Sequence, residues 1–349
     1  MAVRLGTEEL NSRLEVIDAE LQAQALPLKY RPLESFKRIH GDVPDGPLRG
    51  SLFDSIAAWY QDRHGKRAAP DGTIGRIPVL LRGEVYLLLV PLTEGDRVVR
   101  LVDQIDGLPE EVGATLSREE FEAIGRKAAG ATISFQKLYN LTVEDGFLDA
   151  VERGLVWRAL FDLETAATTL RHVGDTQNTI FQIHQAAEKF LKVALKRSGS
   201  TADLKRFGHN LPAVFEELKK FSGRYSWLEP CVVALQAFAP NMEIRYSVVP
   251  RRVEEAIEAF HAALSICWRP CANVALRYEA GFGPLSFLTG VFLRGWDSGE
   301  IFLQGQPSER SAHSGIDAFR DISGSRSDDV RHFGQFLGER FVPGGEEPR

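Results

Sequence analysis

The chain has 349 residues, of which 44% are hydrophobic and 26% charged, a composition typical of globular proteins and unlike that of disordered ones. Its formal net charge of −6 excludes a general electrostatic attraction to nucleic acid. The length predicts about two domains. The first residues do not resemble a secretory signal, and no run of ~18 apolar residues predicts a membrane span.

The chain has three cysteines, Cys231, Cys267 and Cys271. An odd and sparse count predicts a reducing compartment, so we expect a cytoplasmic protein. The spacing of Cys267 and Cys271 differs from the two-residue gap of zinc-binding pairs, which favours a packing role. The sequence therefore predicts neither a metal site nor a cofactor.

The N-terminal residues predict two helices with a loop between them. Residues 7–24 carry apolar residues at helical spacing, with Thr7 as the expected N-cap. Residues 25–50 contain four prolines and predict a loop. A second helix is expected to begin near Ser51.

Residues 76–105 change to the pattern of strands, because they are rich in Val, Leu and Ile and are broken twice by turn residues. Two strands joined at Arg82-Gly83 and followed by a third predict a meander. Ser117 with Glu120 predicts the start of a short helix. Residues 1–148 are therefore expected to form a small α+β domain, and they contain no phosphate loop, dinucleotide fingerprint or nucleophile elbow.

Residues 152–272 predict an all-α, up-and-down bundle, because apolar residues recur there in 3-4 spacing with short connections. Five such stripes are present, and they begin at Val156, Ile180, Leu211, Leu228 and Val253.

Residues 273–349 predict a weakly structured extension. A hairpin is expected around Asp297-Ser298-Gly299, a mobile linker over 304–327 and a short helix over 328–341. The predicted fold class is therefore multi-domain α+β, with an α+β domain, a helical bundle and this C-terminal segment.

Four stretches of the bundle carry a family resemblance: "DLETAATTL" at 162–170, "DTQNTIFQIHQAAEKFLKVAL" at 175–195, "GHNLPAVFEEL" at 208–218 and "IRY" at 244–246. Their order and spacing resemble the HEPN superfamily, in particular the branch paired with nucleotidyltransferases. The resemblance covers about a third of the chain, roughly residues 152–272. It implies a helical bundle that dimerises and that binds a nucleotide, RNA or a partner protein.

Nuclease members of this superfamily carry an Arg followed four to six residues later by a His at the start of the last helix. Such a pair would stabilise charge at the scissile phosphate and move protons at the 2′-hydroxyl. Arg245 is present here, but positions 250–252 are Pro, Arg and Arg. The catalytic candidates are therefore Arg245 with a His from elsewhere in the bundle, either His184 or His209.

Helical spacing places His184, Glu188, Lys192 and Lys196 on one helix face. Residues 192–224 also carry eight basic and three acidic residues, a local excess that could meet phosphates. The predicted binding set comprises Glu188, Lys192, Lys196, Arg245, Tyr246, Arg251 and Arg252.

Each of these residues also has a structural interpretation. The polar helix face could be solvated or hydrogen-bonded to a neighbouring helix, and His209 or Asn210 could cap the helix that follows. Arg245 could form an ion pair with Glu188.

Three hypotheses follow. The first is a non-catalytic module that binds a nucleotide, RNA or a partner, in a defence or toxin–antitoxin context. The second is a metal-independent endoribonuclease, and the third is a scaffold without a ligand. A nucleotidyltransferase or antitoxin-like partner would be a separate polypeptide, because the Gly-Ser and Asp-x-Asp signature of that enzyme does not occur here. We expect a homodimer without membrane association.

Overall fold

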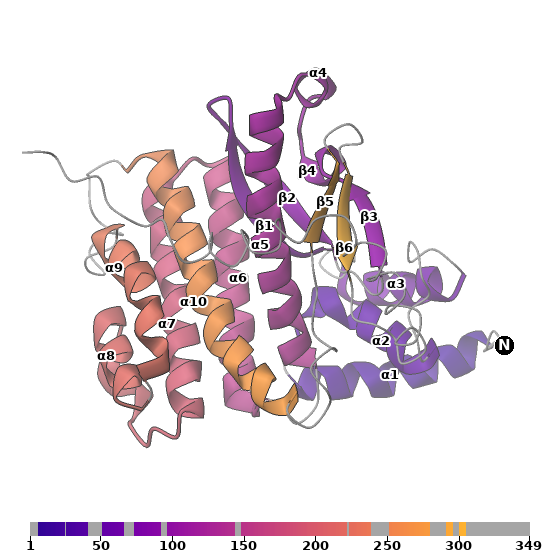
Figure 1. Cartoon of the computed structure of the whole chain (residues 1–349). Coiled ribbons are helices and arrows are strands. Elements are labelled where there is room, and N and C mark those ends of the chain that lie inside the picture. Colours follow the sequence, from indigo (N-terminus) through magenta and orange to yellow (C-terminus); the bar gives the residue numbers. More distant parts are fainter. Residues whose placement is uncertain are drawn as a thin grey trace, which may run out of the picture.

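The structure is a computed structural model of the whole chain (Figure 1). It describes residues 6–24, 26–40, 51–65, 73–91, 96–143, 148–221, 223–238, 251–279, 291–295 and 300–304. The fold is α+β and mostly helical, as the sequence predicts.

Three helices form the N-terminal part of the fold: α1 (Thr7–Ala23), α2 (Arg31–His40) and α3 (Ser51–His64), with the short 3₁₀ helix η1 (Leu28–Tyr30) before α2. They share a small apolar cluster of Leu10, Leu14, Phe36, Ile56 and Tyr60. The expected helices at 7–24 and from Ser51 are confirmed.

Two details of this region were predicted wrongly. Residues 28–40 are helical and not a loop, because Pro32 falls in the first turn of α2, where a proline does not interrupt the hydrogen-bond ladder. Gly6 and not Thr7 occupies the N-cap position of α1, and no side chain caps that end.

The first sheet has the strand order β1-β2-β4, formed by β1 (Thr73–Leu81), β2 (Glu84–Pro91) and the two-residue β4 (Ile105–Asp106). Arg82 and Gly83 join β1 to β2 with φ values of 52° and 86°, as a tight turn with two left-handed residues requires. The expected hairpin is therefore confirmed. The expected meander is wrong, because β4 and not the strand over residues 96–100 pairs with β2.

Helix α5 (Arg118–Val143) begins where the sequence predicts, with a capping box at Ser117 and Glu120. The Glu120 amide donates to Ser117 Oγ at 3.2 Å, and the Ser117 amide donates to Glu120 Oε2 at 2.8 Å. The helix is 26 residues long rather than short. Its length allows it to contact both the first sheet and the helical bundle.

The bundle consists of α6 (Ala150–His172), α7 (Thr176–Arg197), α8 (Leu211–Phe221), α9 (Glu229–Phe238) and α10 (Val253–Glu279) (Figure 1). All five expected helices are confirmed. Asp149 caps α6 in a reciprocal capping box with Glu152. α7 packs against α6, α8 and α10 and is therefore the central helix of the bundle.

The second sheet has the order β3-β6-β5 and joins distant parts of the chain. The predicted C-terminal hairpin is present as β5 (Val291–Gly295) and β6 (Glu300–Gln304), which pair antiparallel. β6 also pairs with β3 (Asp96–Arg100), a contact that the sequence did not predict. The expected linker beyond residue 304 and the helix at 328–341 lie outside the described residues.

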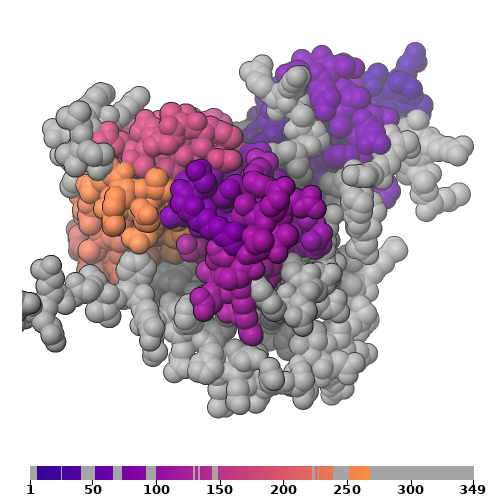
Figure 2. Space-filling model, turned by 90° about the horizontal axis from the view of Figure 1, so that it is seen from above, coloured from indigo at the N-terminus to yellow at the C-terminus, as the bar shows by residue number. Residues whose placement is uncertain are grey.

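One continuous apolar core runs from α1 through the first sheet and α5 into the bundle. Tyr30 illustrates this continuity, because its ring stacks on Trp157 of α6 at a centroid distance of 5.0 Å and meets Tyr139 of α5 edge-on at 5.3 Å. Seen from above in Figure 2, the indigo N-terminal helices and the orange α10 lie on opposite sides of the purple strands and α5. The division into domains at 1–148, 152–272 and 273–349 stays a prediction.

Candidate functional site

The predicted site residues fall in three places of the bundle. His184, Glu188, Lys192 and Lys196 lie on α7, and His209 lies in the segment that leads into α8. Arg251 and Arg252 immediately precede α10. Arg245 and Tyr246 lie outside the described residues, so the predicted Arg245–Glu188 pair also lies outside them.

The segment between α7 and α8 brings His209 to the side of α7. Gly208 has a φ of 53°, a left-handed conformation that suits glycine. Asn210 caps α8, because its Oδ1 accepts from the Ala213 amide at 3.0 Å and its carbonyl accepts from the Val214 amide at 3.1 Å. Of the two capping candidates, Asn210 is therefore the N-cap, and the His209 side chain contacts α7.

Glu188 is the centre of a polar cluster between α7 and this segment. Its carboxylate is buried, with 5% of the side chain exposed. Lys192 Nζ donates to Glu188 Oε1 at 2.6 Å, and His209 Nδ1 lies 2.9 Å from Glu188 Oε2. The Gln185 amide lies 3.2 Å from the same His209 nitrogen. A buried carboxylate with two such partners satisfies the requirement that buried charge be paired.

Lys192 of α7 bonds to the segment between α7 and α8 and holds it against α7. Besides its ion pair with Glu188, its ammonium donates to the Gly208 carbonyl at 2.8 Å. The adjacent His209 side chain is held by Glu188, so two neighbouring residues of the connection are anchored on one helix turn. We therefore expect His209 to keep a fixed orientation.

His209 is half exposed, with 52% of its side chain accessible. Since Nδ1 faces the Glu188 carboxylate, the tautomer that fits has hydrogen on Nδ1, which donates to that carboxylate. Nε2 then carries a lone pair on the far side of the ring. No described residue bonds to Nε2, so it can accept a hydrogen bond from a ligand.

His184 is buried and has a different environment. Its Nδ1 is buried without a hydrogen-bond partner among the described residues. Burial lowers the pKa of His184, opposed by the nearby Glu188 carboxylate. A buried, neutral imidazole is poorly placed to contact a phosphate at the surface. Of the two candidate histidines, His209 is therefore the accessible one.

Internal ion pairs compensate most of the predicted basic excess of residues 192–224. Lys196 pairs with Asp149, and Arg197 pairs with Glu152 at 3.0 Å. Arg206 and Lys220 both pair with Glu217, and Lys219 pairs with Glu216 and Glu229. The count of charges over residues 192–224 did not include these partners, because Asp149, Glu152, Glu188 and Glu229 lie outside that range.

A second buried pair crosses from α6 to α7. Lys189 donates to Asp162, and both side chains are less than a fifth exposed. Burial raises the pKa of Asp162, and the hydrogen bond from Lys189 opposes that shift. Lys189 therefore bonds to the neighbouring helix α6, and spacing along α7 alone could not identify Asp162 as its partner.

Arg251 and Arg252 lie at the other end of α7. The Arg251 carbonyl accepts from Thr176 Oγ1 at 2.9 Å, which places the start of α10 beside the first turn of α7. Twelve residues of helix separate Thr176 from Glu188, or about 18 Å at 1.5 Å per residue. Arg252 is exposed, with 75% of its side chain accessible. These arginines and His209 therefore cannot bind the same phosphate.

Among the residues that the structure describes, no group of three or more His, Cys, Asp or Glu side chains could hold a metal ion. Cys231 is partly exposed, and Cys267 is buried in the core. Within the same residues, no helix is both long enough and apolar enough to cross a membrane.

Comparison with known proteins identifies the bundle. The model of the HEPN domain family matches residues 153–268, which span α6 to α10. No curated protein and no solved structure matches the chain. The match agrees with the resemblance of the α7 and α8 sequences, whereas the nucleotidyltransferase-associated branch stays a prediction. Residues 153–268 of this chain are therefore a HEPN domain.

Proposed function

We propose that this chain is a HEPN-domain protein that binds RNA through the surface around His209. The observation that carries the proposal is the 2.9 Å contact between His209 Nδ1 and the buried Glu188 carboxylate. This contact orients the exposed imidazole of His209 and leaves its Nε2 available as a hydrogen-bond acceptor. The ribose 2′-hydroxyl is a donor that RNA has and DNA lacks, so such an acceptor fits RNA.

Arg251 and Arg252 form a separate positively charged site at the start of α10. Arg252 is 3.8 Å from Glu255 and mostly exposed, so its pair is weak in water. Because these residues lie about 18 Å from the Glu188 turn along α7, we assign them to another phosphate of the same RNA or to a partner. Glu188 and Lys192 hold His209 in place. Lys196 forms an ion pair with Asp149, the N-cap of α6.

The test is the binding of a labelled single-stranded RNA, followed by fluorescence anisotropy in EDTA. We expect the RNA to bind more tightly than DNA of the same sequence, and more weakly as salt rises. His209→Ala should weaken RNA binding by about fivefold to tenfold, the worth of one hydrogen bond. The matched control is His172→Ala, since His172 is another exposed histidine of the same domain, at the end of α6.

Binding of RNA that His209→Ala leaves unchanged would place the site elsewhere. The absence of any RNA binding would leave the partner-binding and scaffold hypotheses. The sequence leads us to expect two further partners: a second copy of this chain, and a separate nucleotidyltransferase or antitoxin-like protein. We propose both here. Light scattering of the purified protein tests the dimer.

A second candidate function is metal-independent ribonuclease activity. The observation in its favour is the same carboxylate–histidine pair, since a buried carboxylate that orients an exposed imidazole is an arrangement used in general acid–base catalysis. Incubation of RNA with the protein in EDTA tests it. Cleavage that is lost in His209→Ala and kept in His172→Ala would support this candidate, and Arg245→Ala would test the arginine that the sequence indicates. Intact RNA would exclude it for that substrate.

A further inference from the structure

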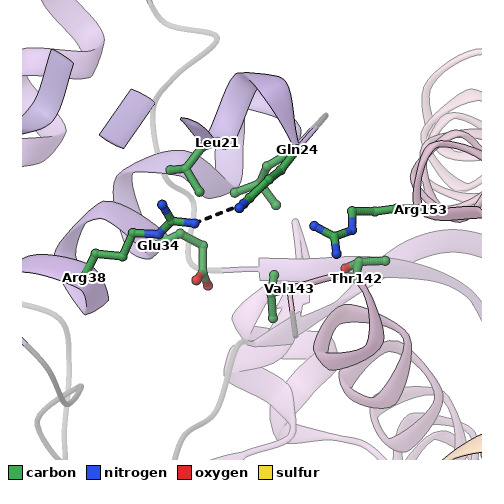
Figure 3. Close-up of a pocket in the computed structure, with 8 residues that line it drawn as sticks. Leu21, Gln24, Glu34, Arg38, Thr142, Val143 and Arg153 are labelled. Carbon is green, nitrogen blue, oxygen red and sulfur yellow. Dashed lines mark hydrogen bonds between the residues drawn. The ribbon is translucent and has the colours of Figure 1, made fainter. Parts of the chain in front are cut away.

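A small pocket lies where the N-terminal helices meet α5 and α6 (Figure 3). It is lined by Leu21 of α1, by Gln24 and Leu26 after that helix, by Glu34 and Arg38 of α2, by Thr142 and Val143 at the end of α5, and by Arg153 in the first turns of α6. Only Arg153 belongs to the HEPN domain. The pocket is therefore distinct from the His209 surface and lies at the junction of the two parts of the chain.

Arg153 is buried, with 8% of the residue exposed. Arginine keeps its charge in proteins and carries five N–H donors, so a buried guanidinium requires acceptors. Within the described residues, Arg153 has one long bond, from Nη2 to the Leu148 carbonyl at 3.4 Å, and no carboxylate partner. Its Nε is buried and has no hydrogen-bond partner in the described part of the chain. The guanidinium therefore has unused donors.

Arg153 directs these donors toward the pocket, and Arg38 and Gln24 lie across from it (Figure 3). Arg38 donates to Glu20 at 2.7 Å and to Gln24 Oε1 at 3.0 Å. Because the Gln24 carbonyl oxygen accepts from Arg38, its amide NH₂ remains a donor. Donors and positive charge are thus present on two sides of the pocket.

The acidic residue that lines the pocket has other partners. Glu34 Oε1 accepts from the Tyr139 hydroxyl at 2.6 Å and lies 3.3 Å from the Lys37 ammonium. Glu34 therefore does not neutralise Arg153 in this arrangement. Its charge would still oppose an anion in the pocket, and this makes Glu34 a sensitive probe of what binds there.

The cavity volume is about 10 Å³, close to what a single water molecule or one oxygen atom of a ligand needs. We propose that this pocket takes one oxygen of a phosphate group, from inorganic phosphate or from a nucleotide, as the partner that Arg153 lacks among the described residues. An ionised oxygen receiving charge-assisted hydrogen bonds from a guanidinium is a strong pairing. Occupation would connect α1 and α2 to the first helix of the HEPN domain.

The test uses the full-length protein with inorganic phosphate and with adenosine monophosphate, each compared with sodium chloride at equal ionic strength. Isothermal titration calorimetry measures affinity, and thermal unfolding measures stabilisation. We expect phosphate to bind and to raise the unfolding temperature. Equal affinity for both compounds would identify the phosphate group as the whole ligand, and tighter binding of the monophosphate would identify a nucleotide.

Three variants make the outcome decisive. Arg153→Met should fold, since it replaces a buried charge by an apolar chain of similar length, and should lose phosphate binding by about tenfold or more. Glu34→Gln should strengthen binding, because it removes a negative charge from the pocket wall. The control Arg63→Met removes a surface arginine paired with Glu15 and should bind phosphate unchanged.

Failure of phosphate to bind the unaltered protein would overturn the proposal. So would phosphate binding that survives Arg153→Met. If Glu34→Gln leaves phosphate affinity unchanged, the phosphate does not bind beside Glu34, and the assignment to this pocket is overturned. None of these outcomes depends on RNA binding, because His209 lies at a separate surface.

Discussion

Lys29 of η1 and Glu164 of α6 form an ion pair across the junction of the N-terminal part and the HEPN domain, with Nζ and Oε2 2.5 Å apart. Arg76 of β1 contacts the other oxygen of the same carboxylate. All three side chains are less than a quarter exposed. One carboxylate of the HEPN domain thus faces two cations from outside it.

This arrangement predicts that Glu164→Gln destabilises the protein. The substitution keeps the shape of the side chain but leaves Lys29 and Arg76 without this counter-charge, which should cost about 2 kcal/mol of unfolding free energy. Urea unfolding measures it. Glu9→Gln removes an exposed carboxylate paired with Arg13 and should change stability by no more than about 0.5 kcal/mol. Equal losses in both variants would contradict the role assigned to Glu164.

The N-cap residues of α6 and α7 should differ in how strongly salt changes their contribution to the free energy of unfolding. Asp149 caps α6 and also pairs with Lys196, whereas Asp175 caps α7 by accepting from the Asn178 amide at 2.9 Å. Asp149→Ala and Asp175→Ala should each cost about 1 kcal/mol through the lost cap. The loss in Asp149→Ala should shrink as salt rises, because its ion pair is half exposed and screened. Unfolding at low and high salt checks this, and parallel losses would contradict it.

Gly75 predicts a steric effect at the first sheet. A Cβ atom there would lie 2.5 Å from the buried ring of Phe135 on α5. Gly75→Ala should therefore force that ring to move and destabilise the protein by about 1–3 kcal/mol. Gly154→Ala on α6 is the matched control, since no atom lies within 4 Å of its added Cβ and alanine favours the helix. A similar stability for both variants would show that Phe135 yields freely.

His261 of α10 predicts a loss of stability in acid. Burial lowers its pKa from 6.5 to about 4, and the charge of Lys127 acts in the same direction. As pH falls from 6.5 to 4, the unfolded chain therefore takes up this proton before the folded one does, and folding stability decreases. The full loss from this group is at most about 3 kcal/mol.

His261→Leu removes this proton and should flatten the decline of stability between about pH 7 and pH 4. Urea unfolding across that range measures the slope. His172→Leu, which replaces an exposed histidine, should decline in parallel with the unaltered protein. An unchanged slope in His261→Leu would mean that other groups cause the acid sensitivity.

The sequence predicted the bundle well because each of its helices carries its own signal. Apolar stripes fixed the positions of all five helices, and the Ser117–Glu120 pair located the start of α5. These signals are local, since they depend on residues within one or two turns. The strand over residues 96–100 was misplaced because its partner, β6, lies far away in the sequence.

The candidate site was predictable only in part for the same reason. Helical spacing placed Glu188 and Lys192 on one face, and in the structure they form an ion pair at 2.6 Å. The contact of His209 with Glu188 depends on the turn at Gly208, and the pairing of Lys189 with Asp162 depends on how α6 packs on α7. Neither could be inferred from spacing along one element.

The pairing of β3 with β6 has a consequence for the order of events during synthesis. Asp96 pairs with Gln304, so β3 emerges from the ribosome long before its partner exists. At about 5–20 residues per second, a separation of about 200 residues corresponds to a delay of roughly 10–40 seconds. The HEPN helices are translated within that interval, so they can assemble first. The second sheet then closes last and joins an early strand to one of the latest segments of the chain.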